Sequence, residues 1–310
     1  MPRTIVIVGS GGRLGAALLR EWRARGEQVL GFDRAALDLG NGPAIHERLE
    51  PLDFDVLVNC AAQTNVDHCE REPEEAFRVN SSAVATLAEI GARKKARCIH
   101  ISTDYVFDGT KGTAYEEGDK PNPISKYGES KLAGERGLLA VSDRHLAVRV
   151  SWVFGRDRAS FVDQIIQRAL GQDRVEAIAD KVSVPTYTLD AARLLLALVD
   201  RPEIGGVVHL CNTGECTWQE YGQHALDCAA ASGLPLRTRH VEPLKLAEMK
   251  SFIARRPVHT PLANTKFTQL TGITPRSWRE AVKDYVRTSL APRTLSSTAI
   301  ANPDRPGHSS

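Results

Sequence analysis

The chain has 310 residues, of which 42% are hydrophobic and 25% charged, and its formal net charge is +2. These ordinary values predict a globular protein and exclude a strong electrostatic surface for nucleic acid or anionic membranes. No stretch approaches the roughly 20 apolar residues that span a bilayer, and a predicted strand begins at Thr4 without a signal peptide. We therefore expect a cytoplasmic protein without nucleic-acid or membrane partners.

The first half of the chain alternates short apolar runs with helical patterns. Continuous hydrophobicity in the runs indicates strands that are buried on both faces, as in a parallel sheet between helices. Strand–helix alternation of this length predicts a doubly wound α/β sheet. The expected strands are Thr4–Val8, Gln28–Phe32, Val56–Asn59, Arg97–Ser102 and Leu146–Val150. The expected helices are Leu14–Arg25, Pro43–Leu49, Pro73–Lys95 and Ser125–Ala140.

The second half is less regular. Proline and turn residues at Arg255–Pro261 and Thr274–Arg276 predict long loops, which are the usual place for substrate contacts. From Ala291 the chain is rich in Ser, Thr, Ala and Pro without apolar periodicity, which predicts a disordered tail. The other expected elements are helices at Ala159–Leu170, Leu189–Val199 and Trp218–Ala231 and a strand at Val207–Leu210.

A glycine turn follows the first predicted strand. Gly9, Gly12 and Gly15 fit G-x-x-G-x-x-G, in which glycine allows a sharp turn, close approach of backbone N–H groups to a pyrophosphate, and tight helix packing. The N-terminus of the next helix favours an anion there. A glycine triplet alone also fits a structural turn, but the strand–turn–helix context predicts a Rossmann dinucleotide site that includes Arg13 and Leu14.

Charged side chains follow the second predicted strand. Asp33 lies 18 residues beyond Gly15 and can bond the ribose hydroxyls of NADH while repelling the 2′-phosphate of NADPH. Arg34 could receive that phosphate instead, and Asp33 also fits a plain turn residue. Further expected cofactor contacts are Asp38 and Leu39 beneath the adenine, and the small residues Ala61 and Ala62 after the third strand.

Tyr127 and Lys131 form Y-x-x-x-K, so on a helix they share one face. Carbonyl reduction needs a proton on oxygen, and a phenol with a pKa of about 10 is a sluggish acid at neutral pH. A neighbouring ammonium is expected to lower that pKa toward the working range. The pair alone is weak evidence, but Thr103 follows the fourth strand, where its hydroxyl can bond a substrate carbonyl. The three residues predict a Thr–Tyr–Lys catalytic triad.

Four segments carry a family resemblance. Ser102–Gly109 reads S-T-D-Y-V-F-D-G, and Pro123–Glu135 fits P-x-x-x-Y-G-x-[ST]-K-x-x-G-E. Arg149–Gly155 fits R-x-S-W-[VL]-[YF]-G, and Arg256–Lys266 fits R-P-x-x-[ST]-x-L-x-x-x-K. In this order, over about residues 3–288, the chain resembles the dTDP-4-dehydrorhamnose reductase family of the extended short-chain dehydrogenase/reductase superfamily.

The resemblance implies NADPH- or NADH-dependent reduction of a 4-keto-6-deoxyhexose held as its dTDP conjugate, which yields dTDP-L-rhamnose. It implies Thr103, Tyr127 and Lys131 as the catalytic residues. Trp152 would line the sugar pocket, although it also fits a core aromatic. A substrate pyrophosphate needs a second anion site, for which Arg256 is expected, although a solvated basic turn is the alternative. The other implied contacts are Thr64 with the cofactor, and Asn65, Asp67, Thr103 and Asp104 with the substrate.

Two departures from the family pattern leave the exact sugar nucleotide open. Arg13 replaces the usual glutamine of the glycine turn, and Asp180–Thr186 lacks a glycine usual before its Pro-Thr. An epimerase or dehydratase of the superfamily is one alternative, but a 4,6-dehydratase would want more than the single carboxylate of Asp104 beside Thr103. A silent regulatory subunit is another, and the complete triad disfavours it.

The domain prediction combines these observations. We expect a Rossmann domain carrying the triad over residues 1–155, a smaller substrate-binding portion with some return to the sheet over 156–290, and a disordered tail over 291–310. The six cysteines show no C-x-x-C pair and no histidine at metal-ligand spacing, so reduced thiols and no structural metal are expected. The resemblance allows a homodimer and Mg²⁺, but the sequence indicates neither.

Overall fold

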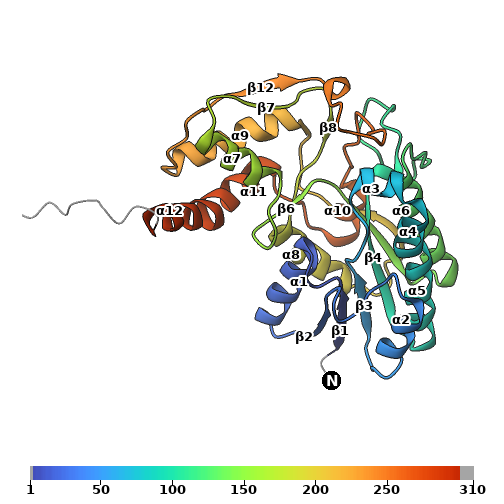
Figure 1. Cartoon of the computed structure of the whole chain (residues 1–310). Coiled ribbons are helices and arrows are strands. Elements are labelled where there is room, and N and C mark those ends of the chain that lie inside the picture. Colours follow the sequence, from blue (N-terminus) through green and yellow to red (C-terminus); the bar gives the residue numbers. More distant parts are fainter. Residues whose placement is uncertain (1–2, 301–310) are drawn as a thin grey trace, which may run out of the picture.

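The computed structural model describes residues 3–300, with side chains described through residue 295. Its centre is a parallel sheet with the strand order β10-β5-β4-β3-β1-β2 (Figure 1). The predicted doubly wound Rossmann sheet is therefore confirmed, and β4 is one residue longer than expected. The strands are β1 (Thr4–Val8), β2 (Gln28–Phe32), β3 (Val56–Asn59), β4 (Arg97–Thr103), β5 (Leu146–Val150) and β10 (Gly206–His209).

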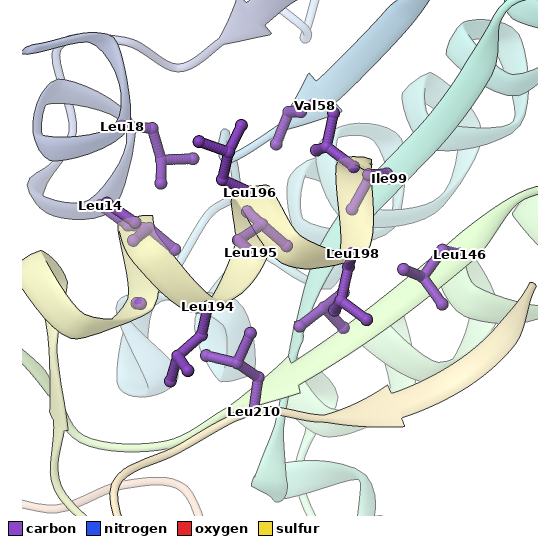
Figure 2. Packing of buried hydrophobic residues seen from close by; sticks show 14 of the residues in the cluster. Leu14, Leu18, Val58, Ile99, Leu146, Leu194, Leu195, Leu196, Leu198 and Leu210 are labelled. Atoms are coloured by element: carbon purple, nitrogen blue, oxygen red, sulfur yellow. The ribbon is translucent and has the colours of Figure 1, made fainter. Parts of the chain in front are cut away.

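Helices cover both faces of the sheet. Successive strand residues alternate between two clusters, so that Ile7 belongs to one and Val6 and Val8 to the other. The leucines of α8 pack over Val58 and Ile99 on the first face (Figure 2). This two-sided burial explains why the strands are continuously hydrophobic. The first face carries α1 (Arg13–Ala24) and α8 (Thr188–Val199), and the second carries α2 (Gly42–Leu49), α5 (Ala83–Arg93) and α6 (Lys126–Val141).

One predicted helix is interrupted. The pattern over Pro73–Lys95 predicted a single helix, whereas the structure has α4 (Pro73–Phe77), a π-turn η1 (Arg78–Ser82) and α5. Asn80 lies in this π-turn, and its side chain donates to Gln63 O at 3.0 Å and to Ser130 Oγ at 3.0 Å and accepts from Gln63 N at 2.8 Å. The π-turn thus directs the buried Asn80 amide toward Gln63 and Ser130. Apolar periodicity in the sequence cannot predict such a turn.

The C-terminal half builds a second core beyond the carboxyl ends of the sheet strands (Figure 1). Phe154, Tyr187 and Tyr285 pack as a ring cluster with centroids 5.1–5.7 Å apart. α8 and β10 return to the large sheet, as expected, while the boundary at residue 155 stays a prediction. The helices here are α7 (Phe161–Gly171), α9 (Trp218–Ala231), α10 (Thr265–Thr271) and α11 (Trp278–Tyr285). The short strands are β6 (Val153–Phe154), β7 (Val175–Ile178), β8 (Val182–Ser183), β9 (Thr186–Tyr187), β11 (Cys216–Thr217) and β12 (Val241–Leu244).

The predicted disorder from Ala291 is wrong for the part of the tail that the structure describes. α11 continues through a π-turn, η4 (Val286–Leu290), into α12 (Ala291–Ile300). Leu290 and Ala291 are buried in the second core. Tertiary contact therefore overrides a composition without apolar periodicity. The rest of the predicted tail, 301–310, lies outside the described residues.

Candidate active site

The carboxyl ends of β1 to β5 meet at one edge of the sheet, because all five strands are parallel. A cavity of about 720 Å³ lies along this edge. Its lining begins at the glycine turn after β1 and extends past the ends of β2 and β3 to Tyr127 and Lys131 on α6. The cavity therefore joins the predicted phosphate-binding turn to the predicted proton-transfer residues.

The glycine turn is shaped for close backbone approach. Gly9 has φ +80°, and a Cβ placed on it would lie 2.6 Å from Ala61 N. A Cβ on Gly15 would lie 2.3 Å from Gly9 O, so Gly15 allows α1 to pack against the turn. No side chain caps the N-terminus of α1 at Gly12, within the part of the chain that the structure describes. Its backbone N–H groups thus fit the pyrophosphate of a dinucleotide.

The cavity gathers almost every residue predicted to contact the cofactor. Gly15 is the exception, because it packs helix against turn instead of facing the cavity. Asp33 lies at the end of β2 and its Oδ1 accepts from Ala36 N at 2.9 Å. The predicted residues that line the cavity are Gly9, Gly12, Arg13, Leu14, Asp33, Arg34, Asp38, Leu39, Ala61, Ala62, Thr64, Tyr127 and Lys131.

Several lining residues were missed by the sequence analysis. Ser102 belongs to a quoted motif but received no role; its buried Oγ has no hydrogen-bond partner among the described residues, which leaves it free for a ligand. Gln63 is held by Asn80 of the π-turn, for which the sequence gave no signal. Arg158 comes from the loop before α7, far along the chain from the glycine turn.

The triad residues come from two elements. Thr103 ends β4, while Tyr127 and Lys131 lie one turn apart on α6, which begins after Ser125 accepts a hydrogen bond from Gly128 N. Thr103 is buried near enough to Tyr127 to affect the pKa of the phenol, while its own hydroxyl donates to Asp104 Oδ1 at 3.2 Å. Both Tyr127 and Lys131 line the cavity, whereas Thr103 is buried beside them and is not part of its lining. The structure thus brings the three predicted side chains together.

The protonation of this site differs from the expectation. Burial raises the pKa of Tyr127, which is opposite to the lowering expected from Lys131, and the influence of Thr103 opposes this rise only in part. The Lys131 Nζ donates to Ile101 O at 2.7 Å and lies 2.9 Å from His100 Nε2, and burial lowers the pKa of Lys131 to about 8. Sequence spacing gave the shared helix face but could not show burial.

Asp67 and Arg256, two predicted substrate contacts, bind each other. The carboxylate accepts from Arg256 Nη1 and Nη2 at 2.7 Å each and from the backbone N–H groups of Ile253 and Ala254 at 2.9 Å. The Arg256 hydrogen bond lowers the pKa of Asp67 to about 2. A substrate phosphate would therefore meet a neutralised pair, which weakens the expectation that Arg256 alone forms an anion site.

Asp104 and Trp152 are held by the protein interior. Asp104 is buried and accepts from Ser183 Oγ at 3.0 Å and from Thr260 Oγ1 at 2.6 Å, so it supports the site from behind. Trp152 packs against Trp218 and Tyr221 with ring centroids 5.6 and 6.1 Å away. Neither lines the cavity along the sheet edge. Asn65 caps α3 (Val66–Arg71) through His68 N at 2.9 Å and is likewise outside the lining.

A second cavity of about 1040 Å³ lies in the C-terminal half. Ala159 belongs to its lining, while the preceding Arg158 lines the first cavity, so the two adjoin at this loop. The Arg256 guanidinium lies over the Phe252 ring, 4.1 Å from its centroid, which links the Asp67 pair to the second cavity. Its aromatic and polar lining includes Phe161, Trp218, Phe252, Gln164, Gln167 and Glu176.

Comparison with known proteins shows the family. The model described as the RmlD substrate binding domain matches residues 3–290. The dTDP-4-dehydrorhamnose reductase of Aggregatibacter actinomycetemcomitans is 33% identical over 286 residues, which cover 90% of this chain and 97% of that protein. This chain belongs to the dTDP-4-dehydrorhamnose reductase family. The resemblance carried by the four sequence segments is thereby confirmed.

Solved structures of this reductase family share the fold. The dTDP-4-dehydrorhamnose reductase of Clostridium acetobutylicum has a TM-score of 0.84 and 32% identity, covering 91% of this chain and 98% of that one. The Bacillus anthracis enzyme, solved in complex with NADP, has a TM-score of 0.84 and 28% identity over 91% of this chain and 98% of its own. The match extends through both cores, not only through the nucleotide-binding sheet.

The described part of the chain shows neither a membrane-spanning helix nor a metal-binding cluster, and its cysteines are unpaired. No helix there is long and apolar enough to cross a membrane. No group of three or more His, Cys, Asp or Glu side chains there could hold a metal ion. All six cysteines are unpaired in the described residues, five of them buried. The residues that line the first cavity are therefore the candidates for the chemistry of the site.

Proposed function

We propose that the protein is an NADPH- or NADH-dependent reductase of a dTDP-linked 6-deoxyhexulose. It reduces the 4-keto group of dTDP-4-dehydro-L-rhamnose and yields dTDP-L-rhamnose. The observation that carries the proposal is the position of Tyr127 and Lys131 in the wall of a cavity that begins at an uncapped glycine turn. Thr103 is buried beside them at the end of β4. A cavity of this size suits a small-molecule ligand.

Each triad residue has a distinct task. Bound NAD(P)H supplies the hydride that adds to the keto carbon. Tyr127 holds a proton on its phenol oxygen at neutral pH, because burial raises its pKa, and can donate it to the keto oxygen. The Thr103 hydroxyl donates to Asp104 Oδ1 at 3.2 Å, so it would have to turn away from that carboxylate to donate to the keto oxygen. Lys131 is fixed by Ile101 O and His100, which leaves one of its three N–H donors for the cofactor ribose.

The second cavity is the proposed place for the thymidine diphosphate. Aromatic rings can stack on a base, and glutamine amides can bond its edges. Arg256, which is paired with Asp67, packs over the ring of Phe252 in the lining of this cavity. We therefore propose that Asp67 and Arg256 orient the substrate, together with Asn65 and Trp152. A homodimer and a cytoplasmic location also remain proposals.

The surroundings of Asp104 disfavour the dehydratase alternative. Its carboxylate accepts from Ser183, Thr260 and Thr103 and is buried behind the triad, so it is not available as an acid toward a sugar. No other carboxylate is adjacent to Thr103 in sequence. A silent regulatory role is disfavoured because the cavity and all three triad residues are in place.

The proposal is tested by following NADPH and NADH oxidation against a panel of nucleotide-linked 4-keto sugars. We expect turnover with dTDP-4-dehydro-L-rhamnose, and much less with UDP- or GDP-linked 4-keto sugars. Oxidation with another member of the panel only would keep the chemistry and change the substrate. Cofactor binding without oxidation in any reaction would support the silent regulatory role instead.

Cofactor preference depends on Asp33 and Arg34, which both line the cavity. If Asp33 bonds the adenosine ribose, NADH is used at least as well as NADPH, and Asp33→Ala shifts kcat/KM toward NADPH because a repelling charge is lost. Asp33→Asn is the matched control: it removes the charge while keeping an oxygen acceptor for Ala36 N. A strong preference of the unmodified protein for NADPH would show that Arg34, and not Asp33, determines the choice of cofactor.

A further inference from the structure

The loop before α7 crosses the glycine turn and is attached to it by an arginine. Arg13 donates to Val153 O at 3.2 Å, to Arg158 O at 3.2 Å and to Ala159 O at 2.6 Å. All three of its guanidinium nitrogens are therefore used, two by carbonyls of the loop and one by a carbonyl of β6. Arg13 lines the cavity, but these bonds direct its charge to loop carbonyls and away from a cofactor phosphate.

A second arginine reaches in the opposite direction. Arg158 Nε donates to Gly11 O at 2.8 Å, and its side chain lines the first cavity beside Gly12. Its two terminal nitrogens make no hydrogen bond to any residue that the structure describes. A planar guanidinium with two free nitrogens beside an uncapped helix N-terminus is suited to phosphate oxygens.

The loop is anchored independently of any ligand. Asp157 pairs with Arg20 of α1, so the residue next to Arg158 is tied to the same helix that begins at the glycine turn. Arg158 carries the charge that remains uncompensated at this point, since the Arg13 guanidinium is bonded to carbonyls and Arg20 faces Asp157. Because Arg158 lines the first cavity and not the second, the anion it faces is on the cofactor side.

We propose that Arg158 binds the pyrophosphate of the nicotinamide cofactor, and that Arg13 is a positioning residue that holds the Arg158 loop over the glycine turn. The inference rests on the proposed cofactor-dependent function. The positive charge at the phosphate site then comes from Arg158 in the loop before α7. Arg13, which the sequence predicted as a phosphate contact, anchors this loop instead.

Calorimetric dissociation constants for NADH, NADPH and dTDP test the proposal with the full-length protein. Arg158→Ala should weaken the binding of both cofactors about 10- to 100-fold, which is the effect of losing one charge-assisted hydrogen bond. The factor should be the same for NADH and NADPH, because the pyrophosphate is common to both. Affinity for dTDP should change little. Arg156→Ala, an exposed neighbour in the same loop, is the matched control and should leave all three constants within about twofold.

The role of Arg13 is tested by coupling. If it acts through Arg158, Arg13→Ala weakens cofactor binding, but adding Arg158→Ala causes less further loss than it does in the unmodified protein. Additive losses would contradict the positioning role. Unchanged cofactor binding in Arg158→Ala, or a loss for dTDP alone, would overturn the phosphate contact. Failure of the unmodified protein to bind either cofactor would instead contradict the proposed function.

Discussion

The Tyr127→Phe variant is expected to lose about 10²–10⁴-fold in kcat, the range of a positioned acid–base group. Phenylalanine keeps the ring, which packs edge-on against Tyr105 with the ring centroids 5.5 Å apart, so the local packing should survive. It removes the phenol oxygen that holds the transferable proton. Steady-state kinetics should show the loss in kcat, while cofactor binding measured by calorimetry stays close to that of the unmodified protein.

Tyr221→Phe is the matched control for this variant. Tyr221 is also buried, and its hydroxyl has no hydrogen-bond partner among the described residues, so its loss should leave kcat nearly unchanged. A Tyr127→Phe protein that retained more than about half of the original kcat would contradict the assigned proton transfer. A simultaneous loss of cofactor binding would indicate a damaged cavity instead.

The Glu135→Leu variant is expected to lose about 3–5 kcal/mol of unfolding free energy, because it leaves a buried guanidinium without its counter-ion. Arg149 donates to the two carboxylate oxygens of Glu135 at 2.9 and 2.7 Å, and the two side chains are only 3% and 2% exposed. His209 lies 3.4 Å from Arg149 but cannot replace the lost negative charge, since burial lowers the pKa of His209 to about 3 and leaves it neutral. Chemical denaturation measures the loss.

The double variant Glu135→Leu/Arg149→Met separates lost pairing from lost packing. Removing both charges should recover much of the stability, because an apolar pair of similar volume avoids the buried charge. A single-variant loss below about 1 kcal/mol, the scale of an exposed ion pair, would contradict the account. So would a double variant no more stable than Glu135→Leu.

Elements that follow local patterns were predictable from the sequence. The six strands of the large sheet and the glycine turn could be found because both signals lie within a few consecutive residues. Tyr127 and Lys131 were placed on one helix face by their spacing alone. Tail residues 291–300 were mispredicted because the burial of Leu290 and Ala291 depends on distant helices.

Features that depend on distant segments were not predictable. The partner of Arg256 is Asp67, 189 residues away, and only the fold brings the two together. Arg158 likewise reaches Gly11 from 147 residues along the chain. The direction of the Tyr127 pKa shift was mispredicted because burial outweighs the charge that the Y-x-x-x-K spacing suggested. Sequence motifs therefore located the site, but contacts between residues far apart in the sequence determine its electrostatics.

The central claim is tested most directly by following the transferred hydrogen. Purified protein is incubated with dTDP-4-dehydro-L-rhamnose and NADPH or NADH carrying deuterium at both C4 positions, and the product is examined by NMR and mass spectrometry. The account predicts dTDP-L-rhamnose with one deuterium at C4 of the sugar, and no such product from Tyr127→Phe over the same time. A sugar product without deuterium at C4, or deuterium at another carbon, would contradict it.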